Sequence, residues 1–221
     1  MSSSDVKHAP YRTKKQVKGL SLSKFKQQQH VKIMIIGNGN VGKTCLCTRL
    51  SQQRFPGGSI DEYVPVTVDP CTQTVHFPSL SQQHSDPFTV ELIDTAGGEY
   101  YDTVREQTYA QVDLILVAYN CVDSNSLQNV SYTWLPEARK HAPQTPIILV
   151  STKIDLRHNQ DILSRKMKII SFEEGEELAK HSHCLTFLET SALRDEGCND
   201  FLEICVKAIM LSKRTQSCLL Q

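Results

Sequence analysis

The sequence lacks three features that would place it in other protein classes. No stretch approaches the roughly 18 consecutive apolar residues of a membrane-spanning helix. The 221 residues carry 24 Lys plus Arg against 24 Asp plus Glu, so no excess of positive charge favours a nucleic-acid partner. The eight cysteines form no CxxC pair, and we expect reduced thiols that mostly fill the core. What is present, 39% hydrophobic and 22% charged residues, is typical of one globular α/β domain.

Positive charge is concentrated at the N-terminal end. Residues 1–30 contain seven basic side chains against Asp5 alone, so residues 31–221 carry the opposite balance. This segment lacks the apolar block of a secretory signal, and Arg12 is its only arginine, which fits a mitochondrial presequence poorly. It is rich in Ser, Lys and Gln and shows neither helical nor strand periodicity. We therefore expect residues 1–30 to form a basic, disordered arm.

Short apolar runs alternate with helical patterns along the rest of the chain. The runs are typical of strands buried on both faces, and they occupy residues 31–36, 88–93, 112–119, 147–150 and 185–188. Helical spacing is found in three segments, over residues 124–141, from Ser171 onward and over residues 201–209. The spacing of Ser171 to Glu174 is that of a capping box. The alternation predicts an α/β fold with a doubly wound, mostly parallel six-stranded sheet, helices on both faces and a ligand at the carboxyl ends of the strands.

A glycine-rich loop directly follows the first of these strands. It reads Gly37-Asn38-Gly39-Asn40-Val41-Gly42-Lys43-Thr44, which is the G-x-x-x-x-G-K-[ST] pattern of a phosphate-binding loop. Glycines let the backbone N–H groups of such a loop face a phosphate chain. Lys43 would reach the β- and γ-phosphates, and the Thr44 hydroxyl would bind Mg²⁺. The loop therefore predicts a nucleotide site of the P-loop class.

Three later strand ends add metal and base recognition. Asp94 ends the run 88–93 and is placed to hold the Mg²⁺ shell, and Gly97 would present its N–H to a γ-phosphate. Asp155 follows the run 147–150, and a carboxylate there accepts from both N1–H and N2–H₂ of guanine, whereas adenine offers no such donor pair. The backbone N–H of Ala192 would meet the guanine O6. Together these residues favour GTP over ATP.

At this point residues 31–211 resemble a Ras-superfamily small GTPase, and within it the Rho/Rac family. The finer matches are Cys45-Leu46, Arg54-Phe55-Pro56, Glu62-Tyr63-Val64-Pro65, Tyr101-Asp102-x-x-Arg105 with Tyr109, Trp134-x-Pro136-Glu137, and Thr152. The resemblance implies a P-loop small G domain that hydrolyses GTP to GDP and phosphate, with Mg²⁺ and GTP/GDP bound. It also implies that residues 56–69 are switch I and residues 97–109 are switch II.

The resemblance assigns roles to individual residues. Lys43 and Gly97 would be catalytic, Phe55 would lie edge-on against the guanine, and the metal would be held by Thr44, Asp94 and Thr67. The nucleotide-binding residues would be Gly37, Asn38, Gly39, Asn40, Val41, Gly42, Lys43, Thr44, Cys45, Phe55, Gly97, Thr152, Lys153, Asp155, Leu156, Ser191, Ala192 and Leu193.

The sequence departs from the family pattern at three places. The family has Gln directly after D-T-A-G to orient the attacking water, and here Gly98 stands at that position, so we expect slow intrinsic hydrolysis. The switch I threonine of the family aligns with Val66, and Thr67 follows one place later, in a segment with four extra residues. Between Asp155 and Ser171 the chain is longer than in a Ras-like domain and shorter than the typical Rho insert, with basic residues Arg165, Lys166 and Lys168 that we expect to be a solvated surface.

The last four residues, Cys218-Leu219-Leu220-Gln221, form a C-a-a-X motif. Residues 212–221 are therefore expected to be a short tail prenylated at Cys218, helped at an anionic membrane by Lys213, Arg214 and the basic arm. The resemblance implies partners of four kinds, namely exchange factors, GTPase activators, a dissociation inhibitor and effectors. It places the protein in the cytosol and on the cytoplasmic face of a membrane, the plasma membrane above all, without a nucleic-acid partner.

Three alternatives stay open from the sequence. The first is a module that holds GTP and barely hydrolyses it, which Gly98 favours. The second is a pseudo-GTPase scaffold whose switch I cannot close. The third is a P-loop nucleotide kinase or ATPase, which the segment Thr152 to Asp155 disfavours.

Overall fold

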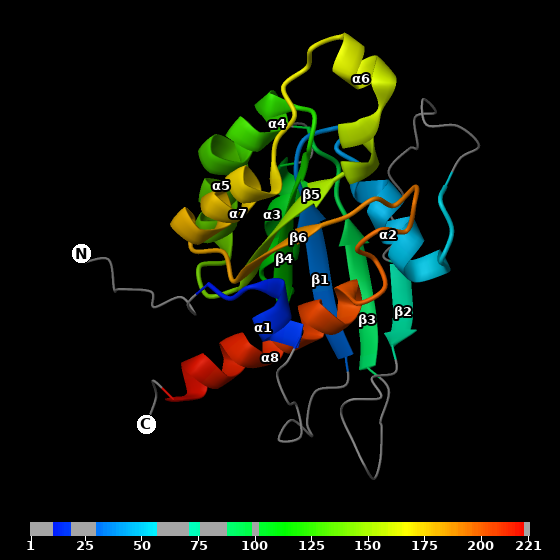
Figure 1. Cartoon of the computed structure of the whole chain (residues 1–221). Coiled ribbons are helices and arrows are strands. Elements are labelled where there is room, and N and C mark those ends of the chain that lie inside the picture. Colours follow the sequence, from blue (N-terminus) through cyan, green and yellow to red (C-terminus); the bar gives the residue numbers. More distant parts are fainter. Residues whose placement is uncertain (1–10, 19–29, 57–70, 76–87, 99–101, 219–221) are drawn as a thin grey trace.

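The structure is a computed structural model, and it describes residues 11–18, 30–56, 71–75, 88–98 and 102–218. Within this part of the chain, six strands form one sheet: β1 (His30–Ile36), β2 (Cys71–Val75), β3 (Phe88–Asp94), β4 (Leu114–Asn120), β5 (Ile147–Thr152) and β6 (Thr186–Glu189). Their order is β2-β3-β1-β4-β5-β6 (Figure 1). Only β2 is antiparallel to its neighbour in this sheet, so the prediction of a doubly wound, mostly parallel six-stranded sheet is confirmed.

The strand β2 had no clear signal in the sequence. Its residues read CTQTV, which is largely polar, because it pairs with only one neighbour at the edge of the sheet. The five parallel strands carried the stronger signal because helices cover both of their faces.

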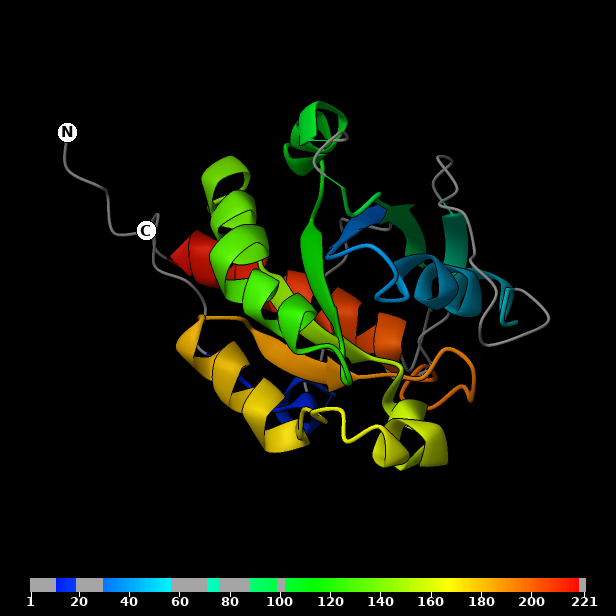
Figure 2. The same cartoon turned by 90° about the horizontal axis from the view of Figure 1, so that it is seen from above.

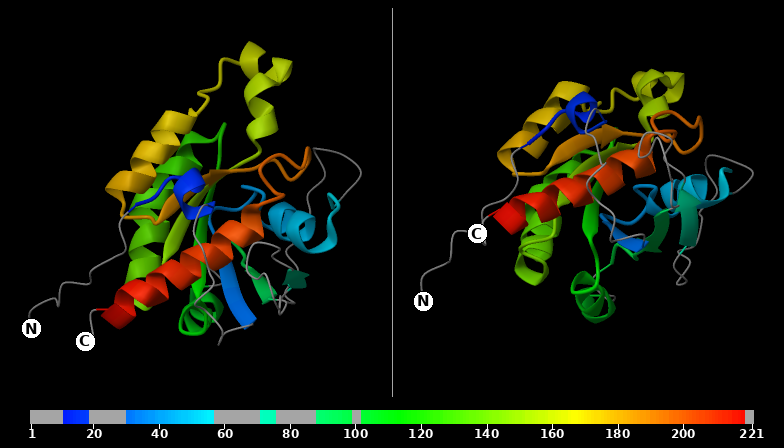
Figure 3. Two further views of the ribbon diagram at one scale, coloured as in Figure 1. Left: turned by 60° about the horizontal axis from the view of Figure 1, so that its bottom comes forward. Right: turned by 90° about the horizontal axis from the view of Figure 1, so that it is seen from below.

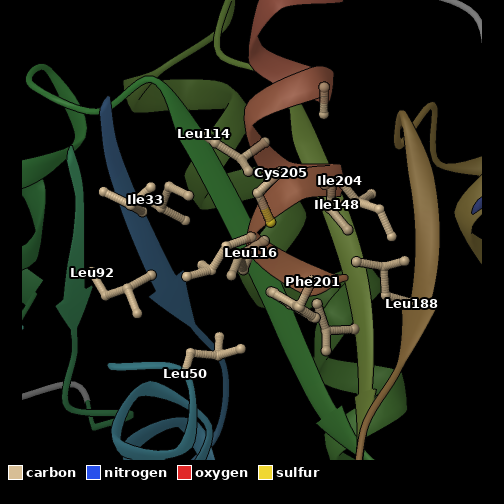
Figure 4. Packing of buried hydrophobic residues seen from close by; sticks show 14 of the residues in the cluster. Ile33, Leu50, Leu92, Leu114, Leu116, Ile148, Leu188, Phe201, Ile204 and Cys205 are labelled. Atoms are coloured by element: carbon tan, nitrogen blue, oxygen red, sulfur yellow. The ribbon is translucent and has the colours of Figure 1, made fainter. Parts of the chain in front are cut away.

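Helices lie on both sides of the sheet (Figures 1 and 2). One side is covered by α2 (Lys43–Gln52) and α8 (Phe201–Cys218). The other side is covered by α3 (Asp102–Tyr109), by the helix over residues 124–141 and by α7 (Phe172–His181). Alternate residues of β4 belong to the two cores: Leu114 and Leu116 pack toward α2 and α8, and Ile115 and Val117 pack toward the opposite helices. Figure 4 shows the first core, in which Leu116 lies beside Phe201 and Cys205 of α8.

The helix predicted over residues 124–141 is present and contains an irregular turn. Its parts are α4 (Ser124–Asn129), the π-helical segment η3 (Val130–Trp134) and α5 (Leu135–His141). The Asp123 side chain caps its start by accepting from the N–H groups of Asn125 and Ser126. The wider π turn, which includes Trp134, shifts the helix register, a feature that is frequent at functional sites.

Two short helices and α7 lie between β5 and β6. Here η4 (Ile154–His158) and α6 (Gln160–Ser164) precede α7. The predicted capping box at the start of α7 is present, because the side chains of Ser171 and Glu174 each accept from the backbone N–H of the other. The predicted solvated surface is also present, because Arg165, Lys166 and Lys168 are exposed.

The C-terminal tail differs from its prediction. Residues 212–218 are helical, because α8 continues without a break to Cys218. Lys213 forms an ion pair of 2.7 Å with Asp113, just before β4, and its expected role at a membrane stays a prediction. Among the described residues, no helix is long and apolar enough to cross a membrane.

The expectation of a disordered N-terminal arm is wrong for residues 11–18. This segment contains α1 (Lys14–Lys18), with a capping box between Thr13 and Gln16, and Val17 is fully buried in the core on the α8 side. Composition could not reveal this helix, because a single apolar side chain that fills a tertiary contact produces no periodicity. The rest of the expected arm, residues 1–10 and 19–29, lies outside the described part of the chain.

Candidate functional site

The phosphate-binding loop connects β1 to α2 in an unusual backbone conformation. Gly37, Asn40 and Gly42 have φ angles of 143°, 60° and 98°. A Cβ atom at Gly37 would lie 2.3 Å from the carbonyl oxygen of Ala118, so only glycine lets the loop pass this close to β4. Gly42 is the N-cap of α2 and offers no side chain to its first N–H groups, which leaves them available for an anion.

Lys43 is held inside the loop. Its side chain is buried, and its Nζ donates to the carbonyl oxygens of Gly37 and Asn38 at 2.8 and 2.7 Å. Burial lowers the pKa of Lys43 to about 8, while the carboxylate of Asp94 opposes the shift. The loop thus holds a buried ammonium group whose charge is only partly balanced, and a phosphate would complete that balance.

Thr44 and Asp94 meet at the carboxyl ends of the strands. The Thr44 hydroxyl donates to Oδ2 of Asp94 at 2.5 Å, and Oδ1 of Asp94 is buried without a hydrogen-bond partner in the structure. Burial raises the pKa of the Asp94 carboxyl, against the hydrogen bond from Thr44 and the charge of Lys43. An orphaned carboxylate oxygen beside a hydroxyl is a pair of hard oxygen ligands, which fits Mg²⁺.

Thr44 and Asp94 are the described residues that could contribute oxygen ligands to Mg²⁺. Among the described residues, no group of three or more His, Cys, Asp or Glu side chains could hold a metal ion. Mg²⁺ is usually held by one or two protein oxygens, substrate phosphates and water, so Thr44 and Asp94 suffice for it. The third predicted metal residue, Thr67, lies outside the described residues.

The two glycines after β3 have opposite surroundings. A Cβ atom at Gly97 would lie 2.4 Å from the backbone nitrogen of Gly39 and 2.5 Å from the carbonyl oxygen of Gly37, so Gly97 must be glycine to lie against the phosphate-binding loop. A Cβ atom at Gly98 would meet no atom of the described residues within 4 Å. Close packing requires the first glycine but not the second, and there is open space where the family carries glutamine.

The predicted base-recognition residues come together at the ends of β5 and β6. Asp155 is buried in η4, and the Ser191 hydroxyl donates to its Oδ1 at 2.5 Å. The Thr152 hydroxyl bonds to the carbonyl oxygens of Val41 and Tyr119 and so connects this edge to the phosphate-binding loop. Lys153 has a φ of 56°, and its Cε lies 3.5 Å from the position of a Cβ at Gly42. The aliphatic stem of Lys153 therefore lies along the loop.

The loop that follows β6, residues 190–200, is closed by its own backbone. Ser191 and Glu196 exchange N–H···O bonds of 2.9 and 3.1 Å. Arg49 of α2 donates from Nε to the carbonyl oxygen of Ala192 at 2.7 Å and so holds this residue in place. The N–H of the same residue is the group that the sequence analysis assigned to guanine O6. We call residues 190–200 the base-recognition loop.

The other predicted residues have less distinctive positions. Val41 is buried, and the two exposed residues of the phosphate-binding loop are Gly39 and Asn40. Among these other residues, the partly exposed ones are Asn38, Cys45, Phe55, Leu156, Ala192 and Leu193. Cys218 ends α8 far from these residues in the sequence, and its side chain lies outside the described set.

Sequence reasoning missed a polar network behind the phosphate-binding loop. The indole Nε1 of Trp134, in the π turn, donates to Oδ1 of Asn38 at 2.7 Å. The guanidinium of Arg105 lies over the Trp134 ring, 5.0 Å from its centroid, and pairs with both oxygens of Glu137 at 2.6 and 3.1 Å. The Tyr109 hydroxyl donates to the same carboxylate at 2.9 Å.

This network also reaches the backbone around Gly97. Nη1 of Arg105 donates to the carbonyl oxygens of Ala96 and Gly98 at 3.2 and 3.4 Å. A buried guanidinium thus fixes the peptide on both sides of Gly97 and connects it to α3 and α5. The signal was available, since Arg105, Trp134 and Glu137 are among the residues that carry the family resemblance, but the sequence could not show that they meet.

Comparison with known families gives one finding. Residues 32–211 match the family model described as the Ras family. The match begins inside β1 and ends inside α8, so it covers the nucleotide and metal residues described above and excludes both α1 and Cys218.

Proposed function

The chain belongs to the Ras family of small GTPases, and we propose that within it this protein is a Rho-like switch with slow intrinsic hydrolysis. Membership of the family makes it a GTP- and GDP-binding switch with GTPase activity in general. The Rho/Rac assignment, the rate and the membrane location are the parts that we add.

One observation carries the assignment of guanine nucleotide to this chain. The Ser191 hydroxyl fixes the buried carboxylate of Asp155 at 2.5 Å. This carboxylate lies at the carboxyl ends of the parallel strands, as does the buried ammonium of Lys43. The first is an acceptor for the two donors of guanine, and the second is a cation for phosphate. Thr152 connects the two halves through the carbonyl oxygen of Val41, so one end of the sheet presents both groups to a single ligand.

Several residues of this chain would act on bound nucleotide. Lys43 would exchange its bonds to the carbonyls of Gly37 and Asn38 for phosphate oxygens, which removes the cost of an incompletely balanced buried charge. Thr44 and Asp94 would hold Mg²⁺, which supplies charge neutralisation to the phosphates when bound. Gly97, which lies against the phosphate-binding loop, would offer its N–H to the γ-phosphate.

Slow hydrolysis follows from the side chain that is missing. Protein groups form no covalent bond in this reaction, so positioning the water is a large part of what the domain contributes. Gly98 is exposed and has no side chain to do this. The switch would therefore remain in its GTP form for longer than a relative with glutamine there.

The Rho-like part of the proposal is supported by the network of Arg105, Trp134, Glu137 and Tyr109. These are among the residues through which the sequence resembles the Rho/Rac branch. Behind the phosphate-binding loop, Arg105 and Tyr109 hydrogen-bond to Glu137, and the Arg105 guanidinium lies over the Trp134 ring, which donates to Asn38. For such a switch we propose exchange factors, GTPase activators, a dissociation inhibitor and effectors as partners. We propose prenylation at Cys218 and a location on the cytoplasmic face of a membrane and in the cytosol; mass spectrometry of the protein from eukaryotic cells, compared with Cys218→Ser, tests the lipid.

The experiment that tests the function measures which nucleotide the protein selects. Purified in Mg²⁺, the chain should retain GDP or GTP, and ATP should fail to displace it. In Asp155→Asn, the amide donates where the carboxylate accepts, so GDP should bind much more weakly while xanthosine diphosphate, with oxygen at C2, gains affinity. Equal displacement by ATP and GTP would overturn the proposal and favour the P-loop kinase or ATPase class.

A second candidate is a GTP-binding module or pseudo-GTPase scaffold with negligible hydrolysis. Gly98 is the observation that favours it. Release of phosphate from the GTP-loaded protein in a single turnover separates the two, since the module would retain intact GTP for the lifetime of the complex.

A further inference from the structure

The described N-terminal segment wraps the open edge of the sheet. Strand β6 is the last strand of the sheet, and residues 11–18 run beside it (Figure 3). Tyr11 packs on the core shared with α7 and donates to Glu176 at 3.1 Å, whereas Val17 is buried in the core shared with α8. Between them, the N–H of Arg12 donates to the carbonyl oxygen of Leu185 at 2.7 Å, just before β6. The segment therefore contacts both helical layers around one edge.

The buried residues of α8 also indicate that α1 covers the outer side of this helix. The sequence predicted a single apolar face along this helix, but Val206, Lys207 and Met210, which point away from that face, are also buried. Val206 and Met210 belong to the same apolar cluster as Val17, and α1 packs against α8. Lys207 donates from its Nζ to the carbonyl oxygen of Lys18 and pairs with Glu203 at 2.7 Å. A lysine on the outer side of a surface helix is usually exposed. Lys207 is buried here, and the carbonyl oxygen of Lys18 in α1 accepts its hydrogen bond.

The segment also reaches the base-recognition loop. Lys18 pairs with Asp200 at 2.6 Å, and Asp200 is the last residue of that loop before α8. Burial raises the pKa of the Cys198 thiol to about 12, and Lys14 of α1 and Arg49 of α2 are among the charges that oppose the shift. The loop therefore lies between two supports: Arg49 holds Ala192 from α2, and α1 holds its other end.

We propose that residues 11–18 brace the base-recognition loop and slow the release of guanine nucleotide. This inference rests on the proposed guanine-nucleotide function and adds a positioning role for a segment outside the matched family region. Ser191, which fixes Asp155, belongs to the loop that α1 supports, so a loose loop would aim the carboxylate less well at the base. Packing of Val17 carries the effect, because Val17 belongs to the same apolar cluster as Cys198 of the loop. The Lys18–Asp200 pair is substantially exposed, and such pairs contribute little.

The test measures dissociation of a fluorescent GDP analogue from the full-length protein in Mg²⁺. Deleting residues 1–18 should speed release by about fivefold to tenfold, the lower range of coupling between two sites. Val17→Asp, which cannot keep a carboxylate buried, should do the same, and Val17→Ile should behave like the unmodified protein. The matched controls are deletion of residues 1–10 and Lys15→Asp, an exposed position on the same helix, and both should leave the rate unchanged.

A second readout separates a brace from general destabilisation. Inosine diphosphate lacks the 2-amino group and keeps only one donor to Asp155. A loosened loop should therefore reduce the preference for GDP over inosine diphosphate, whereas a weakened fold would lower both affinities equally. Unchanged release in both the truncated chain and Val17→Asp would overturn the inference, as would an unchanged preference with faster release. Should the truncated chain not fold, the milder Val17→Ala carries the same test. Failure of the unmodified protein to bind GDP would instead count against the proposed function.

Discussion

Restoring a glutamine at position 98 tests the explanation of slow hydrolysis most directly. A Cβ at position 98 meets no atom of the described residues within 4 Å, and the backbone is outside the left-handed region. Gly98→Gln should therefore enter without distorting the loop. Its amide would lie next to the peptide that Arg105 holds through the carbonyl of Gly98 at 3.4 Å.

The expected gain can be estimated from the loss of one positioned polar group. Such a group is worth about a hundredfold in rate, which corresponds to roughly 2.7 kcal/mol of transition-state stabilisation. The assay is a single turnover: protein loaded with radiolabelled GTP is mixed with Mg²⁺, and phosphate release is followed over hours. Gly98→Gln should release phosphate about a hundred times faster than the unmodified chain.

Two control variants define what the glutamine does. Gly98→Ala occupies the same open space without a polar group, so its rate should equal that of the unmodified protein. Gly97→Ala should weaken nucleotide binding itself, because its Cβ would lie 2.4 Å from the backbone nitrogen of Gly39. Equal rates for Gly98→Gln and the unmodified protein would refute the reasoning, and would show that another group already positions the water.

Three further predictions follow from the geometry. The unpaired Oδ1 of Asp94 predicts a dependence on metal: chelating Mg²⁺ should speed GDP release from the unmodified protein, whereas Asp94→Asn should release GDP rapidly with or without chelator, as fluorescence would measure. Lys43 predicts a dependence on pH, because burial lowers its pKa from 10.5 to about 8 and a bound phosphate would raise it again. GDP binding should then take up a proton above about pH 8 and weaken as the pH rises; calorimetry in two buffers of different ionisation enthalpy measures this uptake, which Lys43→Met should abolish. The network predicts an effect on stability: Trp134→Phe removes the donor to Asn38 and should lower the free energy of unfolding by about 1–3 kcal/mol. Tyr132→Phe, in the same π turn but 81% exposed, should leave urea denaturation unchanged.

The phosphate-binding loop and the sheet could be predicted from the sequence because both are written locally. Gly37, Gly42 and Lys43 stand within one short segment, and each is required by backbone conformation or by the charge of phosphate. Continuous apolar runs such as residues 114–119 identify strands covered on both faces, which is what the two cores on either side of β4 require.

The tertiary structure alone decided which distant residues meet. Asn38 and Trp134 are 96 positions apart, and no periodicity indicates that a π turn brings the indole to the loop. The same holds for Arg105, whose guanidinium reaches both Glu137 and the backbone beside Gly97. The largest error concerned residues 11–18: a basic composition is typical of disorder, yet one buried valine and one backbone bond to Leu185 place the segment on the domain. Composition records what a segment could bury by itself, whereas folding depends on what the rest of the chain leaves uncovered.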